Sequence, residues 1–250
     1  MITYTNEDCM VGMARYPDKY FDLAIVDPPY GVGTVTYMPH KRTDAFGGSF
    51  DTYEITIATL DMNQRAKTRV AVEHSQTGKE TIKGFGDENV APPPEYFAEL
   101  MRVSKHQIIW GGNYYMLPPS RGFIVWRKST VSENFSMAMA EYAWMSFNLN
   151  AKVWEGASQG TGKDPRIHPT QKPVALYKWL LTNYAKPGDK ILDTHVGSAS
   201  SLIACHEMGF DAVGFELDPD YFRASSERLR FAQRQESIFS FIDAQKEDEP

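Results

Sequence analysis

The chain has 250 residues, 42% of them hydrophobic and 13% aromatic, which suffices for one moderate-to-large domain or two small ones. With 26 basic against 32 acidic side chains the net charge is −6, which argues against a protein that coats nucleic acid nonspecifically. The apolar runs are far shorter than the ~20 residues of a membrane-spanning helix, and the polar first ten residues do not resemble a signal peptide.

The first buried element predicted is an apolar run at 21–26, which is typical of a parallel strand covered on both faces. It leads directly into the sequence Asp-Pro-Pro-Tyr at 27–30. Residues 31–90 then become polar, rich in Gly and Thr, and weak in hydrophobic period. Because a structureless stretch of this length is unusual in a compact domain unless functional, we interpret 31–90 as a mobile or target-recognising insertion in a single domain, 1–242.

The remaining elements alternate between strands and helices, which predicts an α/β fold with a doubly wound, mostly parallel sheet and helices on both faces. A Gly-rich linker is expected at 154–166, and the acidic residues 243–250 are expected to form a disordered tail. The predicted strands are 106–112 (which ends in a turn), 122–128, 140–147, 190–193 and 211–217, and the predicted helices are 94–105, 174–184, 200–209 and 219–233.

The loop after the strand at 190–193 has features of a cofactor site. Gly197 and its small neighbours at 198–200 let the backbone approach a ligand closely. Glu216 ends the next strand, and an acid roughly 20 residues beyond a Gly-containing first loop is the spacing that binds ribose hydroxyls. The loop lacks both GxGxxG and GxxxxGK[ST], so it favours an adenosine-bearing cofactor without indicating a pyrophosphate. An ordinary strand–turn–helix junction is an equally open interpretation.

The sequence at 27–30 offers a different chemistry. Its two prolines make the backbone rigid, Asp27 and the Pro28 carbonyl are hydrogen-bond acceptors, and Tyr30 has a flat face for stacking. Such a set would hold a planar group that carries an NH₂, for example the exocyclic amine of a base. Taken alone, these four residues are more simply interpreted as a rigid turn.

Together the two loops resemble the amino-methylating DNA methyltransferases that use S-adenosylmethionine. DPPY at 27–30 matches their catalytic motif, DTHVGSAS at 193–200 is similar to their cofactor loop, and GFELDPDYF at 214–222 is similar to their ribose-binding segment. HPTQKP at 168–173 resembles the segment that holds the methionine end, and NEDCM at 6–10 the segment that touches the adenine. The catalytic loop precedes the cofactor loop, as in the permuted β class.

This resemblance implies a Rossmann-like methyltransferase fold, S-adenosyl-L-methionine as cofactor and double-stranded DNA as partner. The catalytic residues that it implies are Asp27, Pro28, Pro29 and Tyr30. The cofactor-binding residues that it implies are Asp8, Cys9, Asp27, Thr170, Lys172, Asp193, His195, Gly197, Ser198, Ser200 and Glu216. Two positions depart from the family pattern, since Ala199 replaces the usual second glycine and His195 a commonly apolar residue. Residues 31–90 match poorly and leave target recognition open.

The implied reaction is direct methylation of the N6 amine of a flipped-out adenine. Aspartate at position 27 favours adenine, because the enzymes that methylate cytosine N4 more often carry serine there. Three alternatives stay open: a cytosine-N4 enzyme, a protein-glutamine methyltransferase, which usually has asparagine first and an earlier cofactor loop, and a DNA-binding relative without activity. The recognition sequence, a restriction partner and homodimer formation, which is frequent in the family, are equally open.

Cysteine and histidine argue against other chemistries. Neither Cys9 nor Cys205 follows a proline, as the nucleophile for carbon-5 methylation of cytosine typically does, and the two have no paired spacing. We therefore expect a reduced, cytoplasmic setting. The family resemblance implies a bacterial or phage-infected cell. The six histidines show no metal-binding spacing, so no metal site is expected.

Overall fold

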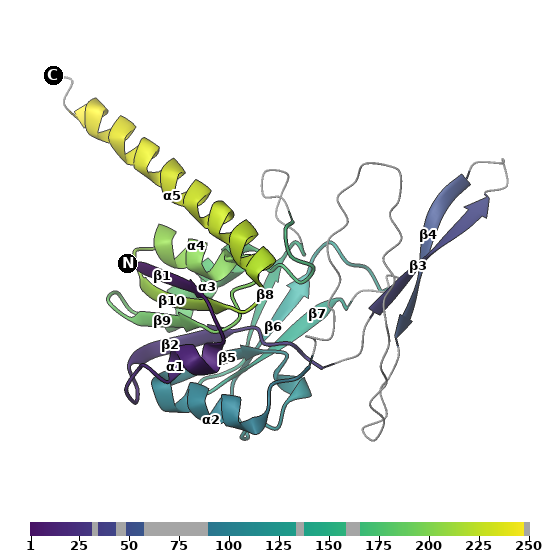
Figure 1. The fold of residues 1–250 in the computed structure, drawn as a ribbon, viewed down its shortest axis with the longest axis horizontal. Coiled ribbons are helices and arrows are strands. Elements are labelled where there is room, and N and C mark those ends of the chain that lie inside the picture. The colour runs from purple at the N-terminus through teal and green to yellow at the C-terminus, as the bar shows by residue number, and fades with distance from the viewer. Residues whose placement is uncertain (32–34, 44–48, 58–89, 134–137, 159–165, 248–250) are drawn as a thin grey trace. The chain divides into compact units, whose positions relative to one another are not determined.

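The computed structural model describes residues 1–31, 35–43, 49–57, 90–133, 138–158 and 166–247 (Figure 1). The chain divides into two compact units. The first comprises Met1–Pro28 and Pro92–Pro250, and the second comprises Pro29–Ala91. Each is described separately below.

The first unit is built on an eight-stranded mixed sheet with the order β1-β10-β9-β2-β5-β7-β6-β8. The first five strands in this order, β1, β10, β9, β2 and β5, are parallel to one another. Strand β7 is antiparallel to both β5 and β6, and β8 is parallel to β6. The expected mostly parallel sheet is confirmed. The strands are β1 (Ile2–Asn6), β2 (Phe21–Val26), β5 (Ser104–Trp110), β6 (Phe123–Lys128), β7 (Ala140–Met145), β8 (Lys152–Gly156), β9 (Lys190–Asp193) and β10 (Asp211–Glu216).

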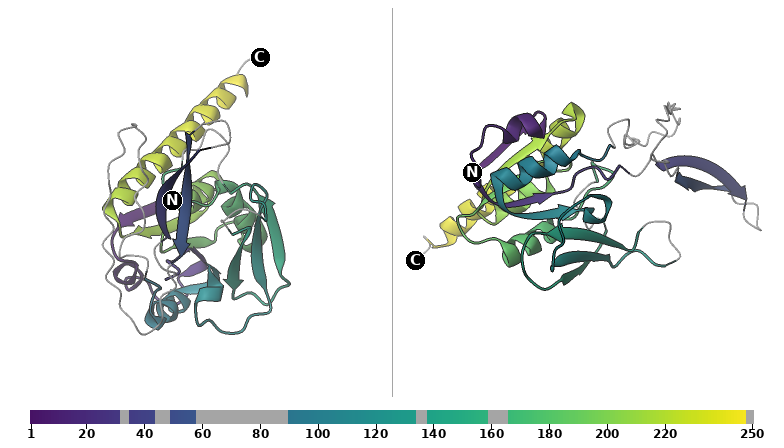
Figure 2. Two further views of the ribbon diagram at one scale, coloured as in Figure 1. Left: turned by 90° about the vertical axis from the view of Figure 1, so that its right-hand side faces the viewer. Right: turned by 90° about the horizontal axis from the view of Figure 1, so that it is seen from below.

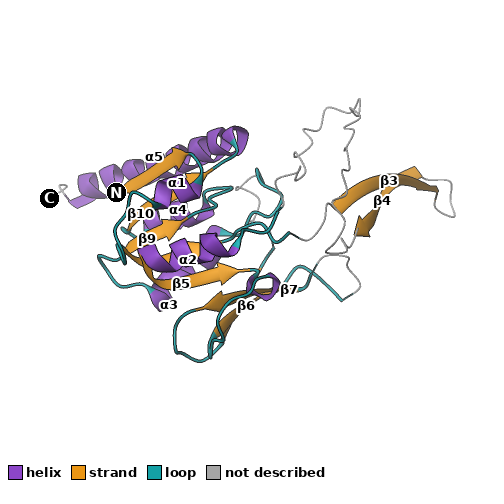
Figure 3. Cartoon of the chain, turned by 60° about the horizontal axis from the view of Figure 1, so that its bottom comes forward, coloured by secondary structure: helices purple, strands orange, loops and turns teal. Residues whose placement is uncertain are grey.

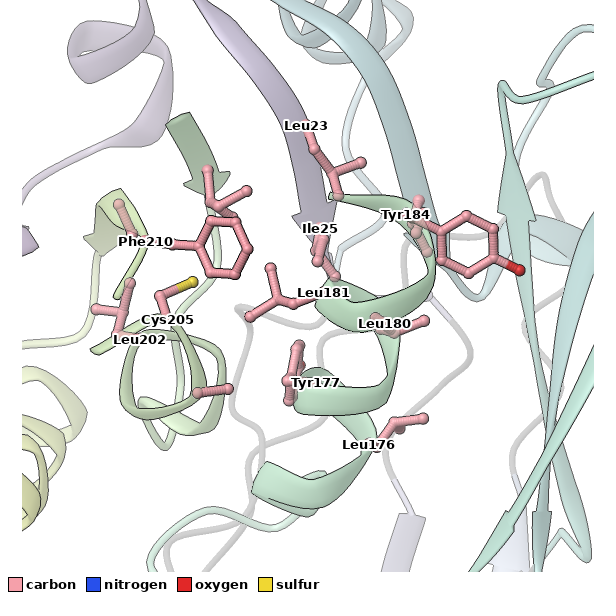
Figure 4. Packing of buried hydrophobic residues seen from close by; sticks show 14 of the residues in the cluster. Leu23, Ile25, Leu176, Tyr177, Leu180, Leu181, Tyr184, Leu202, Cys205 and Phe210 are labelled. Atoms are coloured by element: carbon pink, nitrogen blue, oxygen red, sulfur yellow. The ribbon is translucent and has the colours of Figure 1, made fainter. Parts of the chain in front are cut away.

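Helices cover both faces of this sheet, because side chains of each buried strand alternate between two apolar clusters. Leu23 and Ile25 of β2 pack with α3 and α4, as Figure 4 shows, whereas Ala24 and Val26 pack with α1 and α2. The right-hand view of Figure 2 shows α2 and α3 on opposite sides of the strands. The helices are α1 (Cys9–Met13), α2 (Pro94–Val103), α3 (Val174–Tyr184), α4 (Ser200–Glu207) and α5 (Pro219–Glu247), and a short 3₁₀ turn, η1, spans Gly112–Tyr114.

The strand order reverses between β9 and β2, which are direct neighbours. From β9 the chain passes through α4 to β10, and from β2 it returns through α2 to β5 on the opposite side. The two crossover helices therefore lie on opposite faces of the sheet. A crevice at such a point, outside the carboxyl ends of the strands, is the usual ligand site of an open α/β sheet.

The second unit contains an antiparallel hairpin of β3 (Val35–Thr43) and β4 (Ser49–Ile57), drawn as a pair of orange arrows in Figure 3. The sequence predicts no regular element in 31–90, so this hairpin is an addition to the expectation. Residues 58–89 lie outside the described part of the chain.

Several other elements differ from the sequence-based expectation. The sequence predicts no element at β1 or at the five-residue α1, and β8 extends into the first residues of the segment 154–166 that is expected to be a linker. An unstructured tail is expected from residue 243, but α5 continues to Glu247, and 248–250 lie outside the described residues. No helix in the described part of the chain is long and apolar enough to cross a membrane.

Candidate active site

Asp193 ends β9 and is buried at the start of the expected cofactor loop. Its Oδ1 accepts a hydrogen bond from the backbone N–H of His195 at 3.0 Å, and its Oδ2 accepts one from the Ser201 hydroxyl. Burial raises the pKa of Asp193 to about 7, although these two hydrogen bonds oppose the shift. The carboxyl group thus joins the end of the strand to the first turn of α4.

The loop itself makes two left-handed backbone turns, at Gly197 (φ +54°) and Ala199 (φ +61°). The Gly197 amide donates to Glu216 Oε2 at 2.7 Å. A Cβ atom at Gly197 would meet the imidazole ring of His168 at 3.5 Å, so backbone, ring and carboxylate are closely stacked here. Ala199 adopts the conformation for which glycine is favoured, which gives a physical reason for the glycine usual in the family at this position.

Glu216 ends β10, the next strand of the sheet. Its Oε1 accepts from the amide of Asp218 at 3.0 Å, so both carboxylate oxygens are held by backbone N–H groups. Burial raises the pKa of Glu216, and the backbone hydrogen bonds oppose the shift. A carboxylate has about four lone-pair sites, so this one can also accept from a pair of hydroxyl groups.

The segment 6–10 lies beside Glu216 because β1 is the neighbour of β10. Asn6 donates through its side-chain amide to the Glu216 carbonyl at 2.8 Å. Asp8 caps α1 by accepting from the Met10 amide at 2.7 Å. Burial raises the pKa of the Cys9 thiol to about 12, so it is protonated at neutral pH.

His195 lies between the cofactor loop and α2. Its Nδ1 is 2.9 Å from the Thr194 hydroxyl, which in turn lies 2.6 Å from the Tyr96 hydroxyl. The rings of Tyr96 and His195 meet edge to face with centroids 5.4 Å apart. Burial lowers the pKa of His195 to about 4, so the ring is neutral at physiological pH and acts as a packing group.

The segment 168–173 is another part of the candidate site. The His168 ring lies edge-on to Tyr221 with centroids 4.4 Å apart, and its Nδ1 is 3.2 Å from the Thr170 hydroxyl. Lys172 follows two positions after Thr170 in the same segment. Its buried ammonium forms ion pairs with Asp27 and with Glu141 of β7.

Asp27 and Pro28 follow β2 directly and belong to the first unit. The Asp27 carboxylate accepts from Lys172, and the Pro28 carbonyl accepts from the Tyr115 hydroxyl at 2.8 Å. Burial, followed by the charge of Asp27, holds the pKa of Tyr115 well above its ordinary value, so the phenol stays a donor. Pro29 and Tyr30 belong to the second unit.

Within the first unit, the fold places the ends of β2 and β9 on adjacent strands, and the negative charge of Asp27 acts on Asp193. The sequence does not predict three contacts around Asp27 and Pro28: the Tyr115 hydroxyl on the Pro28 carbonyl, the Lys172 ammonium on Asp27, and Glu141 on Lys172. No local motif marks Tyr115 or Glu141. Among the described residues, no group of three or more His, Cys, Asp or Glu side chains is arranged to hold a metal ion.

A family model described as DNA methylase matches residues 64–227. The type II methyltransferase M.HpaI of Haemophilus parainfluenzae is 32% identical over 80 residues, which are 32% of this chain and 26% of that protein. The type II methyltransferase M.HinfI of Haemophilus influenzae is 22% identical over 258 residues, which cover 91% of this chain and 68% of that protein. The chain thus spans about a quarter of the first relative and about two thirds of the second.

Two solved structures share the fold. The M1.HpyAVI–SAM complex superposes with a TM-score of 0.51 at 15% identity, covering 91% of this chain and all of that one. The cytosine-N4-specific PvuII DNA methyltransferase superposes with a TM-score of 0.53 at 12% identity, covering 94% of this chain and 93% of that one. At these identities the likeness establishes the Rossmann-like methyltransferase fold and nothing further.

Proposed function

Because the chain belongs to the DNA methylase family, we propose that it transfers a methyl group from S-adenosyl-L-methionine to the exocyclic N6 amine of adenine in double-stranded DNA. The family depends on this cofactor. One observation carries the proposal: two fixed acceptors, Asp27 and the Pro28 carbonyl, follow the strand adjacent to the one that leads into the cofactor-type loop. The proposed amine-acceptor site and the proposed adenosine site would thus be neighbours at one edge of the sheet.

The residues of the loop fit an adenosine-bearing group. Gly197 leaves open the space that a Cβ would fill against His168, and Glu216 stands at the end of the next strand with acceptor capacity for two ribose hydroxyls. Segment 6–10 adjoins Glu216 and would line the adenine, and Thr170 would lie toward the methionine end. When bound, the cofactor supplies a methyl group on a positively charged sulfur.

The remaining binding residues are expected to act through their backbone or small size. Asp193 orients the loop by accepting a hydrogen bond from the His195 amide. Ser198 lies just before α4 and Ser200 begins it, and their hydroxyl oxygens are 3.1 Å apart. The Arg228 guanidinium donates to the Ser200 hydroxyl at 3.0 Å. His195 and Cys9 contribute neutral surface.

The chemistry follows from the acceptors after β2. The lone pair of a base amine is delocalised into the ring, so the amine is a poor nucleophile. Hydrogen bonds from its NH₂ to Asp27 and to the second lone pair of the Pro28 carbonyl would favour a tetrahedral nitrogen, and would stabilise the positive charge that develops there. Tyr30 would stack on the flipped base, and Tyr115 keeps the Pro28 carbonyl in place.

The adenine assignment is supported by aspartate rather than serine at position 27. The test is incubation of the purified protein with unmethylated duplex DNA and isotopically labelled S-adenosylmethionine, followed by mass spectrometry of the nucleosides. We expect label in N6-methyladenine. Label in N4-methylcytosine would correct the base and keep the reaction, whereas no labelled nucleoside from folded, cofactor-binding protein would leave a DNA-binding role.

A further inference from the structure

A row of alternating charges runs along the carboxyl edge of the sheet. The row comprises Asp27, Lys172, Glu141 and Lys128. Lys172 and Lys128 have side chains only 2% and 8% exposed, so these charges lie in the protein interior and not on its solvated surface.

Strand order explains how the row forms. Asp27 follows β2, Trp110 ends β5 and Lys128 ends β6, whereas Glu141 lies near the start of β7. Because β7 is antiparallel to β5 and β6, its beginning lies at the same edge as their ends. Four adjacent strands, β2, β5, β7 and β6, therefore bring these groups together.

Glu141 divides its two oxygens between the lysines. Its Oε1 lies 2.6 Å from the Lys128 ammonium, and its Oε2 lies 3.1 Å from the Lys172 ammonium. The Lys172 nitrogen also lies 5.2 Å from the centroid of the buried Trp110 ring. Burial alone would lower the pKa of Lys172, but Asp27 and Glu141 outweigh burial and raise it, so the ammonium stays charged beside Asp27.

A lysine in contact with Asp27 has two opposite effects on the proposed reaction. It fixes the carboxylate in one orientation, but its charge also opposes the negative field that would stabilise a developing cation on the amine. A second carboxylate in contact with Lys172 would offset that charge and hold the ammonium in position. Glu141 supplies this second carboxylate.

We infer that Glu141 is a positioning residue for methyl transfer, which holds Lys172 against Asp27 and offsets its charge, with Lys128 as the second partner of Glu141. The inference rests on the proposed function and adds to it a residue that would touch neither the base nor the methyl donor. A purely structural role for the buried ion pairs is the alternative, and the two differ in measurable ways.

The test compares three variants. Glu141→Gln removes the charge with little change in shape, and Glu141→Gln combined with Lys128→Met restores the local charge balance without restoring the carboxylate. Glu155→Gln is the matched control. Glu155 also pairs with a basic residue of β6, Arg127, at 3.3 Å, but both side chains of this pair are more than half exposed. For each variant we would measure the single-turnover rate of methyl transfer to DNA, the Kd for the cofactor by calorimetry and the midpoint of urea unfolding.

We expect Glu141→Gln to lower the transfer rate about tenfold or more, since small displacements of a reacting group have effects of this size, with the cofactor Kd changed less than about twofold. The double variant should regain much of the unfolding midpoint but not the rate, and Glu155→Gln should match the wild type. A transfer rate that recovers together with stability in the double variant would overturn the inference.

A second measurement does not require activity. In protein with ¹⁵N-labelled lysine, the ammonium resonance of Lys172 can be assigned by its loss in Lys172→Met. We expect the resonance to shift and its protons to exchange faster with water in Glu141→Gln, and to stay unchanged in Glu155→Gln. An unchanged resonance in Glu141→Gln would refute the inference, whereas absence of methyl transfer by the wild-type protein would refute the proposed function alone.

Discussion

Asp27 and Asp193 carry carboxyl groups at the ends of adjacent strands, but their surroundings differ. Asp27 pairs with a lysine ammonium and follows β2, whereas Asp193 is held by a backbone amide and a serine hydroxyl at the end of β9. The first arrangement suits a carboxylate that receives a substrate amine, and the second suits a group that maintains a loop.

We therefore predict that Asp27→Ala reduces methyl transfer by at least 10²-fold, a size typical of a lost group that stabilises transition-state charge, while the Kd for the cofactor stays within about threefold. Single-turnover assays and calorimetry measure the two quantities. Equal losses in both would mean that the two loops do not divide the work as proposed.

The raised pKa of Asp193 leads us to predict an unusual dependence of folding stability on pH. Its pKa is raised by burial to about 7, above the value near 3.9 of an unfolded chain. Between these values the folded state binds more protons than the unfolded state, so this group makes the protein less stable as pH rises from about 4 to about 7. Asparagine can keep both hydrogen bonds, with its oxygen toward the His195 amide and its NH₂ toward Ser201.

We expect Asp193→Asn to remove this loss, so that the stability of the variant relative to wild type increases between pH 5 and pH 8. Urea unfolding at both pH values, without cofactor, measures the change. A constant difference between variant and wild type at the two pH values would show that Asp193 does not titrate in this range.

Ala199 lies in the left-handed region (φ +61°) and its side chain is fully buried. Ala199→Gly relieves backbone strain of about 1 kcal/mol and loses a buried methyl group worth about 0.8 kcal/mol, so we expect nearly unchanged stability. Ala199→Val adds branching at a position that disfavours it and should cost about 2 kcal/mol or more. Denaturant unfolding of the pair tests this, and similar losses in both variants would contradict it.

At the scale of elements, the hairpin of β3 and β4 lies in a unit separate from the one that carries the cofactor-type loop. We propose that this unit, which includes most of the segment 31–90, takes part in recognising DNA. The proposal gives a role to residues 31–63, which precede the range that the family model matches.

Replacing residues 35–57 with a short Gly-Ser linker should therefore leave cofactor binding within about threefold, because the loops after β9 and β10 belong to the other unit. Affinity for duplex DNA should fall at least tenfold. Calorimetry and fluorescence anisotropy measure the two affinities. DNA affinity equal to that of the wild type would place recognition elsewhere.

Elements were predicted well where the local pattern was strong. The apolar run at 21–26 and the amphipathic helices α2 and α3 agree with the sequence-based expectation to within a few residues. Strand β1 has no such signal, since ITYTN is short and half polar, and it is ordered through its pairing with β10, more than 200 residues away. Strand β8 is likewise an edge strand that pairs with β6 alone.

At the scale of the whole molecule, residue types and their spacing determined the fold class, the two strand-to-loop junctions and the candidate residues in them. These features are local, and each can be recognised within a few tens of residues. Which strands are neighbours was decided only by tertiary structure, because strand order depends on pairing between distant segments. Adjacency of β2 and β9 is what brings the acceptors after one strand to the cofactor-type loop after the other.

The same limit applies to the side chains around the DPPY aspartate. Lys172 and Asp27 are separated by 145 positions, and the resemblance of HPTQKP to a cofactor segment gave no sign that its lysine pairs with this aspartate. Tyr115 and Glu141 carry no motif at all. The sequence marked Asp27 as the candidate to receive a substrate amine. The adjacency of β2, β5, β7 and β6 decided which charges surround it, because burial forces each ionised group to find a partner within reach.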